Sequence, residues 1–259
     1  MQNALDFTGK VVIVTGGGKG VGRGISERFL AAGADVAICG RSEPDSLPSA
    51  EGREAWFSAL DVRDPDAVQA FVDSVKEKFG RIDVLINNAG GAPYADAATA
   101  SPRFSESIVR LNLLAPLFFA QACNAVMQQQ EGGSIVNIAS VSAQRPSPGT
   151  AAYGAAKAGL LNLSSSLAVE WAPKVRSNTI IAGLIRTEQS HLHYGDEAGI
   201  AAVGETIPLG RMAVPNDIAE ACLFLASDMA SYVSGAALTV HGGGEKPAFL
   251  GAANADNEK

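Results

Sequence analysis

A tyrosine and a lysine stand four residues apart in the stretch from Ser140 to Lys157. On a helix, Tyr153 and Lys157 would lie on one face, with an ammonium group beside a phenol. A neighbouring positive charge lowers the pKa of a phenol from about 10, so the pair could exchange a proton near neutral pH. Ser140 follows an apolar run and could offer its hydroxyl to the same oxygen. The spacing alone is a weak pattern, which two unrelated side chains on a solvated helix face would also produce.

A glycine-rich turn near the amino end of the chain forms a second chemical pattern. It reads T-G-x-x-x-G-x-G over residues 15–22, after an apolar run at 11–14 and before a helical stretch. Strand, turn and helix in this order suit a dinucleotide, because the glycines let the backbone approach the pyrophosphate and the helix start supplies amide donors. A kinase-type phosphate loop is not indicated, since Gly20 rather than Ser or Thr follows Lys19. The plainer alternative is a flexible turn.

Strand-like and helix-like stretches alternate along the rest of the chain. Apolar runs predict strands at residues 11–14, 36–39, 55–60, 84–86, 135–138, 177–181 and 237–240. Periodic stretches predict helices at 21–32, 65–79, 104–130, 151–171 and 215–227. Asp64 should cap the second helix and Gly80 should close it, and Pro116 should kink the third or shift its boundary. The alternation predicts one α/β domain of the Rossmann type, a doubly wound, seven-stranded parallel sheet with helices on both faces.

Composition narrows the class of protein. The 259 residues are 47% apolar and carry a net charge of −7 without a basic stripe, which argues against a nucleic-acid partner. Cys39, Cys123 and Cys222 lack metal-binding spacing and are predicted to be buried thiols in a reducing compartment. His191 and His193 have no third ligand nearby, so loop histidines rather than a metal site are expected. With no signal-peptide pattern and no apolar run of membrane-spanning length, we expect a cytoplasmic protein that does not bind membranes.

Together these residues resemble the short-chain dehydrogenase/reductase family over about residues 6–244. The resemblance rests on the turn at 15–22, Asp61-Val62, N-N-A-G at 87–90, Asn112, Ser140 and Tyr153-x-x-x-Lys157. It implies reversible hydride transfer between a nicotinamide and a carbonyl or alcohol. Tyr153 would protonate the carbonyl oxygen during reduction, and Ser140 would orient that oxygen. Lys157 would hold the nicotinamide ribose and lower the pKa of Tyr153, and Asn112 would hold a water that links Lys157 to solvent.

The resemblance also implies a set of cofactor-binding residues. These are Thr15, Gly16, Gly18, Lys19, Gly20, Val21, Gly22, Arg41, Asp61, Val62, Asn88, Ala89, Gly90, Tyr153, Lys157, Gly183, Ile185 and Thr187. The family usually has Pro-Gly after the sixth strand, and Ala182-Gly183 here suggests a softer loop. Residues 188–210 would form a lid over the substrate, and a tail at 245–259 would follow the catalytic domain at 1–244.

The tip of the second strand bears on cofactor choice. An NAD site usually has a carboxylate there, but Asp35 precedes the apolar run and the tip is Gly40-Arg41. Arg41 could hold a 2′-phosphate, and Lys19 would add a second positive charge. This pattern favours NADP, with NAD as the other cofactor of the family. The alternative is that both are ordinary solvated charges.

The expected function is NADPH-linked reduction of a carbonyl compound, which could include a 3-oxoacyl thioester. The alternatives are an NAD-dependent alcohol dehydrogenase that works in the oxidising direction and a cofactor-binding regulator without catalysis. The complete set of Asn112, Ser140, Tyr153 and Lys157 argues against the regulator. The partner would be a small-molecule substrate, and Arg145 could meet an anionic group on it or face solvent. Relatives are commonly tetramers, and the apolar helices at 104–130 and 151–171 favour a homotetramer.

Overall fold

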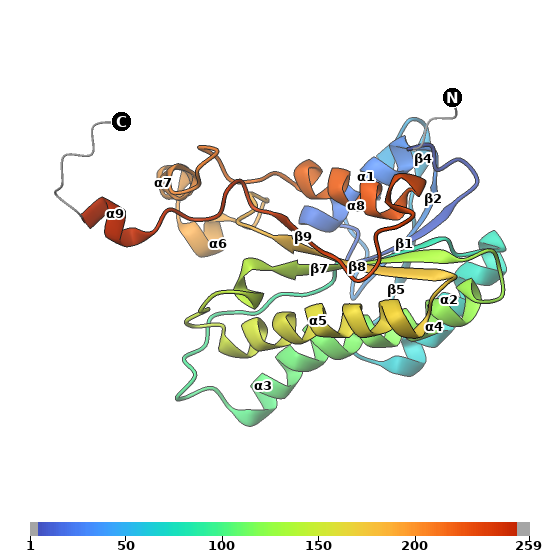
Figure 1. Ribbon diagram of the computed structural model, residues 1–259, viewed down its shortest axis with the longest axis horizontal. Helices are drawn as coiled ribbons and strands as arrows, with labels where there is room; N and C mark the ends of the chain where they lie inside the picture. The colour runs from blue at the N-terminus through green and yellow to red at the C-terminus, as the bar shows by residue number, and fades with distance from the viewer. Residues whose placement is uncertain (1–4, 253–259) are drawn as a thin grey trace.

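The computed structural model describes residues 5–252, in which one sheet lies between two layers of helices (Figure 1). Its strands are β1 (Val11–Thr15), β2 (Asp35–Gly40), β5 (Trp56–Ala59), β6 (Val84–Asn87), β7 (Gly133–Ser140), β8 (Val175–Ala182) and β9 (Ala237–Val240). The spatial order is β5-β2-β1-β6-β7-β8-β9, and every pairing in this sheet is parallel. The predicted fold class is therefore confirmed, and each predicted strand is present with small shifts at its ends.

Two groups of helices bury the two faces of the sheet. One face is covered by α1 (Gly20–Ala31) and α8 (Pro215–Ala226), and the other by α2 (Pro65–Phe79), α4 (Ala115–Met127) and α5 (Ala151–Glu170). Strand β1 shows why its sequence is uninterruptedly apolar. Val12 and Val14 belong to the core under α1 and α8, whereas Val11 and Ile13 belong to the core on the opposite face. Successive side chains point to opposite faces, so a strand covered on both sides has no solvated position.

The ends of α2 follow the predicted capping chemistry. Asp64 accepts hydrogen bonds from the backbone N–H groups of Asp66 and Ala67, at 3.0 and 3.4 Å. At the other end, Gly80 has a φ of 81°, the left-handed conformation that glycine adopts without strain.

The long third helix differs from its prediction around Pro116. It consists of α3 (Pro102–Val109), a π-helical segment (Arg110–Leu114) and α4, in unbroken succession. Proline has no N–H to donate to the preceding turn, so one helical hydrogen bond is missing at Pro116. The hydrogen-bonding pattern changes to a π-helix in the turn just before it. The result is a local widening of the helix that carries Asn112, rather than a simple kink or a shifted boundary.

This composite helix is also apolar enough to be tested as a membrane span. Pro102–Met127 meets the length and composition of one, with a mean hydropathy of 1.3, so the expectation that no segment reaches that length is wrong by this measure. In the fold, 44% of the most apolar 18-residue stretch of this helix is buried. Phe119, Cys123 and Met127 pack against the sheet, which accounts for its apolar side chains without a membrane.

Several short elements were not predicted from the sequence. They are the hairpin of β3 (Ser49–Ala50) and β4 (Arg53–Glu54), the 3-10 turns Val141–Ala143 and Asp228–Ala230, and the helices α6 (His191–Tyr194), α7 (Glu197–Glu205) and α9 (Ala248–Ala252). Helices α6 and α7 occupy the predicted lid, and α9 lies in the predicted tail, of which residues 253–259 are outside the described part. All three cysteines are buried and free, as expected.

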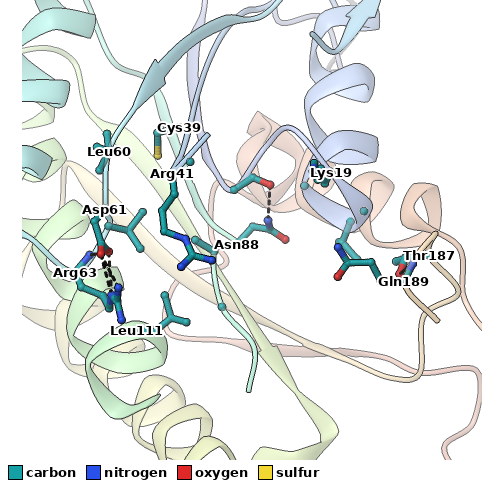
Figure 2. Close-up of a pocket in the computed structure, with 18 of the residues that line it drawn as sticks. Lys19, Cys39, Arg41, Leu60, Asp61, Arg63, Asn88, Leu111, Thr187 and Gln189 are labelled. Carbon is teal, nitrogen blue, oxygen red and sulfur yellow. Dashed lines mark hydrogen bonds and ion pairs between the residues drawn. The ribbon is translucent and has the colours of Figure 1, made fainter. Parts of the chain in front are cut away.

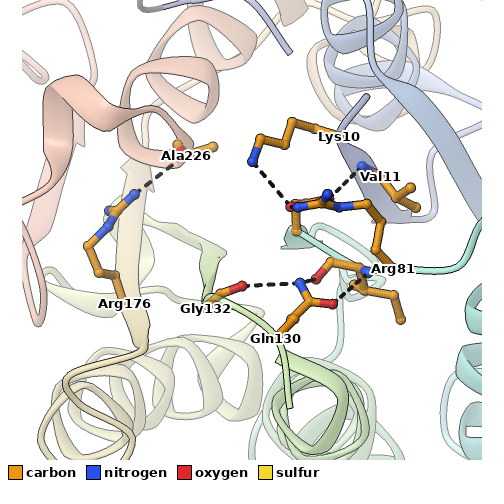
Figure 3. Close-up of polar contacts among 9 residues, drawn as sticks. Lys10, Val11, Arg81, Gln130, Gly132, Arg176 and Ala226 are labelled. Atoms are coloured by element: carbon orange, nitrogen blue, oxygen red, sulfur yellow. Dashed lines mark hydrogen bonds and ion pairs between the residues drawn. The ribbon is translucent and has the colours of Figure 1, made fainter. Parts of the chain in front are cut away.

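Charged side chains at the amino ends of the strands serve the fold (Figure 3). Asp83 accepts from Arg81 Nη2 at 2.6 Å and from the Val11 N–H at 2.9 Å, and Lys10 Nζ lies 3.5 Å from it. Arg176 donates to the carbonyl of Leu225 at 2.7 Å, and so covers the carboxyl end of α8. These charges tie strand and helix ends together at the edge opposite the predicted site.

Candidate active site

The glycine-rich turn and the N-N-A-G segment meet where β1 and β6 end. Thr15 Oγ1 accepts from the N–H groups of Asn88 and Ala89, at 3.0 and 2.9 Å. The Asn88 amide in turn donates to the carbonyls of Thr15 and Gly16, at 2.9 and 3.3 Å. These bonds join neighbouring strands beyond the sheet, so the turn and the loop after β6 form one wall.

Gly22 shows why a glycine is needed in the first turn of α1. A Cβ atom at this position would lie 2.2 Å from the carbonyl oxygen of Gly16 and 2.5 Å from the Asn88 amide nitrogen. Any side chain would therefore separate α1 from the turn. The close approach directs the start of α1 into the space above the strand ends.

A cleft of about 480 Å³ opens above these strand ends (Figure 2). Of the residues predicted to bind cofactor, it is lined by Gly16, Lys19, Gly20, Val21, Gly22, Arg41, Asp61, Val62, Asn88, Ala89, Gly90 and Thr187. They come from segments spread over most of the chain, and the carboxyl ends of parallel strands bring them together.

Six of the residues predicted to bind cofactor do not line this cleft, and two of them, Tyr153 and Lys157, are described below with the catalytic residues. Thr15 is buried beneath it, and Gly18 lines an adjoining hollow against Pro44. Gly183 lines a different cavity, and Ile185 forms an isolated bridge with Ala213.

Ala182, where the family usually has proline, is the last residue of β8. It is in register with Ser140 on one side and Val240 on the other. Alanine permits this pairing because it keeps the N–H that proline lacks. Ala182 itself is therefore part of the sheet, and any softer loop that results from the missing proline begins after it.

Arg63, which was not predicted as a site residue, changes the electrostatics around Asp61 in the wall of the cleft. Its guanidinium donates to both carboxylate oxygens of Asp61, with Nη2 to Oδ2 at 2.6 Å. This pairing, with a smaller contribution from Arg41, lowers the pKa of Asp61 to about 2. Arg41 reaches into the cleft between the Asp61–Arg63 pair and Asn88 (Figure 2), and Lys19 is exposed in the turn. An arginine two residues after the aspartate was the only sequence signal for this pair.

Glu188 links the lid to the glycine-rich turn. Its carboxylate oxygen accepts from the N–H of Gly20 at 3.0 Å, and Gly20 is the first residue of α1. An anion is favoured at a helix N-terminus, where unpaired N–H groups and the helix dipole concentrate positive potential. A carboxylate of the chain itself therefore stands at the place where a phosphate is expected.

The residues predicted to be catalytic meet between β7 and α5. Ser140 ends β7 and accepts from the N–H of Ser142 at 3.2 Å. Gly154 brings α5 against this loop, since a Cβ there would lie 2.9 Å from the carbonyl of Ser142. Tyr153 follows at the start of the helix and faces the same loop, beside a small cavity with Thr150.

The ionisation of Tyr153 differs from the sequence-based expectation. Burial raises the pKa of Tyr153, and its contact with the Ser140 hydroxyl lowers it by less. Lys157 Nζ lies 5.7 Å from the centre of the tyrosine ring and donates to the carbonyl of Ile138 at 2.7 Å. The expected lowering of the Tyr153 pKa is therefore wrong for this structure, because desolvation outweighs the Ser140 contact and the Lys157 ammonium is directed to another acceptor.

Lys157 and Asn112 converge on the loop after β6. Lys157 is buried, and desolvation lowers its pKa to about 8. The Asn112 amide accepts from the N–H of Gly91 and donates to the carbonyls of Gly91 and Ile108, each at 2.9 Å. A Cβ on Gly90 would lie 2.7 Å from Asn112 Oδ1 and 3.2 Å from Lys157 Nζ. The π segment thus holds Asn112 against the backbone that borders the cofactor cleft.

His191 and His193 both lie in α6, and His191 Nδ1 contacts the carbonyl of Glu188 at 3.0 Å. Within residues 5–252, no group of three His, Cys, Asp or Glu side chains is arranged to hold a metal ion.

Comparisons with known proteins show which family the chain resembles. A family model described as enoyl-(acyl carrier protein) reductase matches residues 16–245. The D-threitol dehydrogenase of Mycolicibacterium smegmatis is 38% identical over 248 residues, which cover 91% of this chain and 92% of that protein. A 3-oxoacyl-(acyl-carrier-protein) reductase of Chlamydia trachomatis is 36% identical over 241 residues, covering 90% and 96%. The solved structure of Thermoplasma acidophilum aldohexose dehydrogenase has a TM-score of 0.87 and 31% identity, covering 98% of this chain and 99% of that one.

The chain therefore belongs to the short-chain dehydrogenase/reductase family. It is an NAD(P)-dependent enzyme that interconverts small-molecule carbonyl compounds and alcohols. The cleft suits such a dinucleotide: Gly16, Gly20 and Gly22 give a phosphate access to backbone, and Lys19 and Arg41 supply positive charge.

Proposed function

We propose that the protein is an NADPH-linked reductase of ketones, which oxidises the corresponding secondary alcohols in reverse. The observation that carries this proposal is that Lys157, beside the ring of Tyr153, adjoins Gly90 in the wall of a cleft that also holds Arg41 and Lys19. When bound, the nicotinamide supplies or accepts the hydride. Tyr153 gives the proton to the carbonyl oxygen, Ser140 donates a hydrogen bond to that oxygen, and Lys157 binds the cofactor ribose. Asn112 keeps the loop after β6 in position and holds the water that reaches Lys157.

The remaining assignments follow the cleft. Asp61 and Val62 border the adenine, Asn88 the adenosine ribose, and Ile185 and Thr187 the nicotinamide and phosphate. Residues 1–244 form the catalytic domain with a lid at 188–210, and the protein works as a cytoplasmic homotetramer. The relatives are named for threitol, aldohexose and 3-oxoacyl substrates. These names support a substrate that carries a carbonyl or an alcohol group, either sugar-like or acyl.

The alternative is an NAD-dependent dehydrogenase that works in the oxidising direction. Arg41 and Lys19 favour NADPH, because the tip of β2 carries a guanidinium and no carboxylate. A charge-assisted contact to the 2′-phosphate contributes about 1.5–3 kcal/mol, so kcat/KM should favour NADPH over NADH by more than about tenfold.

The test is to measure kcat/KM with NADPH and NADH for wild type, Arg41→Ala and the surface control Arg103→Ala. Arg41→Ala should lose most of the preference through a higher KM for NADPH, and Arg103→Ala should not change it. An equal or higher kcat/KM with NADH in the wild type would overturn the proposed NADPH preference.

A further inference from the structure

A second cavity, of about 220 Å³, borders the segment that follows Ser140. Val141, directly after Ser140, forms one side, and Gly183 and Leu184, directly after β8, form another. Ile207, from the predicted lid, also lines it. The volume is below the range of about 300–1,000 Å³ usual for pockets that hold drug-sized ligands, so its occupant is small.

Two polar segments from opposite ends of the chain meet in this cavity. Gln144 and Arg145 come from the loop after β7, and His241 and Glu245 from the segment after β9. Arg145 Nη2 donates to Glu245 Oε1 at 2.6 Å. Both side chains are more than a third exposed, and an ion pair of that kind adds little to folding stability.

The position of Glu245 is determined by contacts between the last segment and the lid. Leu209 donates its N–H to the carbonyl of Gly242 at 3.1 Å, and Lys246 donates its N–H to the carbonyl of Thr206 at 3.0 Å. Lys246 Nζ also donates to the carbonyl of Glu205, at 3.2 Å. The chain can turn back along the lid because three successive glycines, at 242–244, have positive φ values. The carboxylate is therefore held at the cavity by backbone contacts on both sides of it.

The neighbours of the ion pair offer further hydrogen-bond donors and acceptors. His241 Nδ1 accepts from the N–H of Gly243 at 3.2 Å, so the hydrogen of the ring is on Nε2, which can donate. Burial and the charge of Glu245 raise the pKa of Tyr194, so its phenol keeps its proton and can donate. Gln144 offers both a donor and an acceptor.

We propose that this cavity selects small, uncharged, polyhydroxylated substrates, with Arg145 and Glu245 as its specificity-determining residues. The inference rests on the proposed function and names the substrate class of that site. A hydroxyl can donate to the carboxylate and a neighbouring hydroxyl can accept from the guanidinium, so the pair matches a vicinal diol. An anionic substrate would need Arg145 alone, and Glu245 both occupies that guanidinium and repels the incoming charge.

The test compares kcat/KM for a four-carbon polyol, a four-carbon hydroxy-acid anion and a 3-oxoacyl thioester. The variants are Glu245→Gln and the matched control Glu197→Gln, which alters an ion pair with Arg186 (2.7 Å) on the outside of the lid. The wild type should prefer the polyol. Glu245→Gln should lower kcat/KM for the polyol by about tenfold, the value of one charge-assisted hydrogen bond, and raise it for the anion. Glu197→Gln should leave both unchanged.

A wild-type preference for the anion or the thioester, or an unchanged ratio in Glu245→Gln, would overturn the inference and leave the proposed function standing. If no carbonyl or alcohol is turned over, the proposed function fails, and the cavity is then judged by binding alone. Saturation-transfer NMR of the polyol with the full-length protein and NADP should show contact in the wild type that is lost in Glu245→Gln. Equal signals in both proteins would reject the cavity assignment without any turnover.

Discussion

Tyr153 has a hydroxyl group whose removal should separate chemistry from cofactor binding. Tyr153→Phe deletes the proton donor and leaves the ring in place, so kcat should fall by roughly 10²–10⁴-fold. The dissociation constant for NADPH, measured by fluorescence titration, should stay near the wild-type value. Tyr232→Phe is the control, because that phenol is fully exposed and does not line the cleft. Residual turnover of Tyr153→Phe within about tenfold of wild type would exclude Tyr153 as the proton donor.

Lys157 should give the protein a characteristic dependence of stability on pH. Its pKa is about 8 when folded and 10.5 in the unfolded chain, so between these values the unfolded chain binds more protons. The free energy of unfolding therefore gains with rising pH through that window, and the cost of the buried charge is fully present below it. Between about pH 7 and about pH 9.5, wild type should gain about 2 kcal/mol relative to Lys157→Met.

Chemical denaturation of both proteins at the two pH values measures this difference, since other titrating groups cancel. A difference that does not change with pH would show that Lys157 is not desolvated in the folded protein.

The sequence predicted only part of the site because its residues differ in what brings them together. Tyr153, Ser140 and Asn88 follow strands or share a helix face, and the periodicity of those elements places them. Glu188 and Glu245 act through contacts with distant segments that no local pattern encodes. The direction of the Tyr153 pKa also required the fold, because burial depends on everything packed around the ring.

Among the elements, α1 and α8 approach each other closely at Gly24, and their crossing should tolerate little added volume. A Cβ at Gly24 would lie 2.5 Å from the Cβ of Pro215, the first residue of α8, and a proline ring cannot rotate away. Gly24→Ala should therefore lose about 1–2 kcal/mol, because overpacking costs more than the gain of about 1 kcal/mol in helix propensity.

Gly159→Ala in α5 is the matched control for this crossing. Its nearest neighbour would be a flexible methyl group of Leu113, at 3.2 Å, which can move aside. Denaturation midpoints should thus fall for Gly24→Ala and stay level or rise for Gly159→Ala. Equal midpoints for the two variants would show that the crossing can relax.

At this scale, apolar periodicity was sufficient for every strand of the main sheet and for the helices that cover it. The π segment was not predicted, because Pro116 indicates an irregular helix but does not determine which hydrogen-bonding pattern the preceding turns adopt. The β3–β4 hairpin and the lid helices α6 and α7 were not predicted because they are too short to show a period.

For the whole molecule, the remaining exposed apolar side chains bear on assembly. Val169 on α5 is 80% exposed, Tyr232 is fully exposed, and Phe249 on α9 is 69% exposed. The proposed homotetramer would cover exposed apolar side chains of this kind at contacts between subunits. We expect light scattering at micromolar concentration to give about 106 kDa, four chains of 26.6 kDa. Val169→Glu should lower that mass, and a wild-type mass of one chain would contradict the homotetramer.

The bond between Glu188 and Gly20 implies a particular time course for cofactor association. If the lid carboxylate must leave the turn before a phosphate can take its place, opening is a separate first-order step. The observed rate in stopped-flow mixing with NADPH should then level off at high concentration, at the opening rate. Glu188→Ala should remain linear to higher concentrations, and Glu205→Ala, an exposed lid carboxylate away from the turn, should level off like wild type. A plateau that is unchanged in Glu188→Ala would mean that the bond between Glu188 and Gly20 does not control the opening rate.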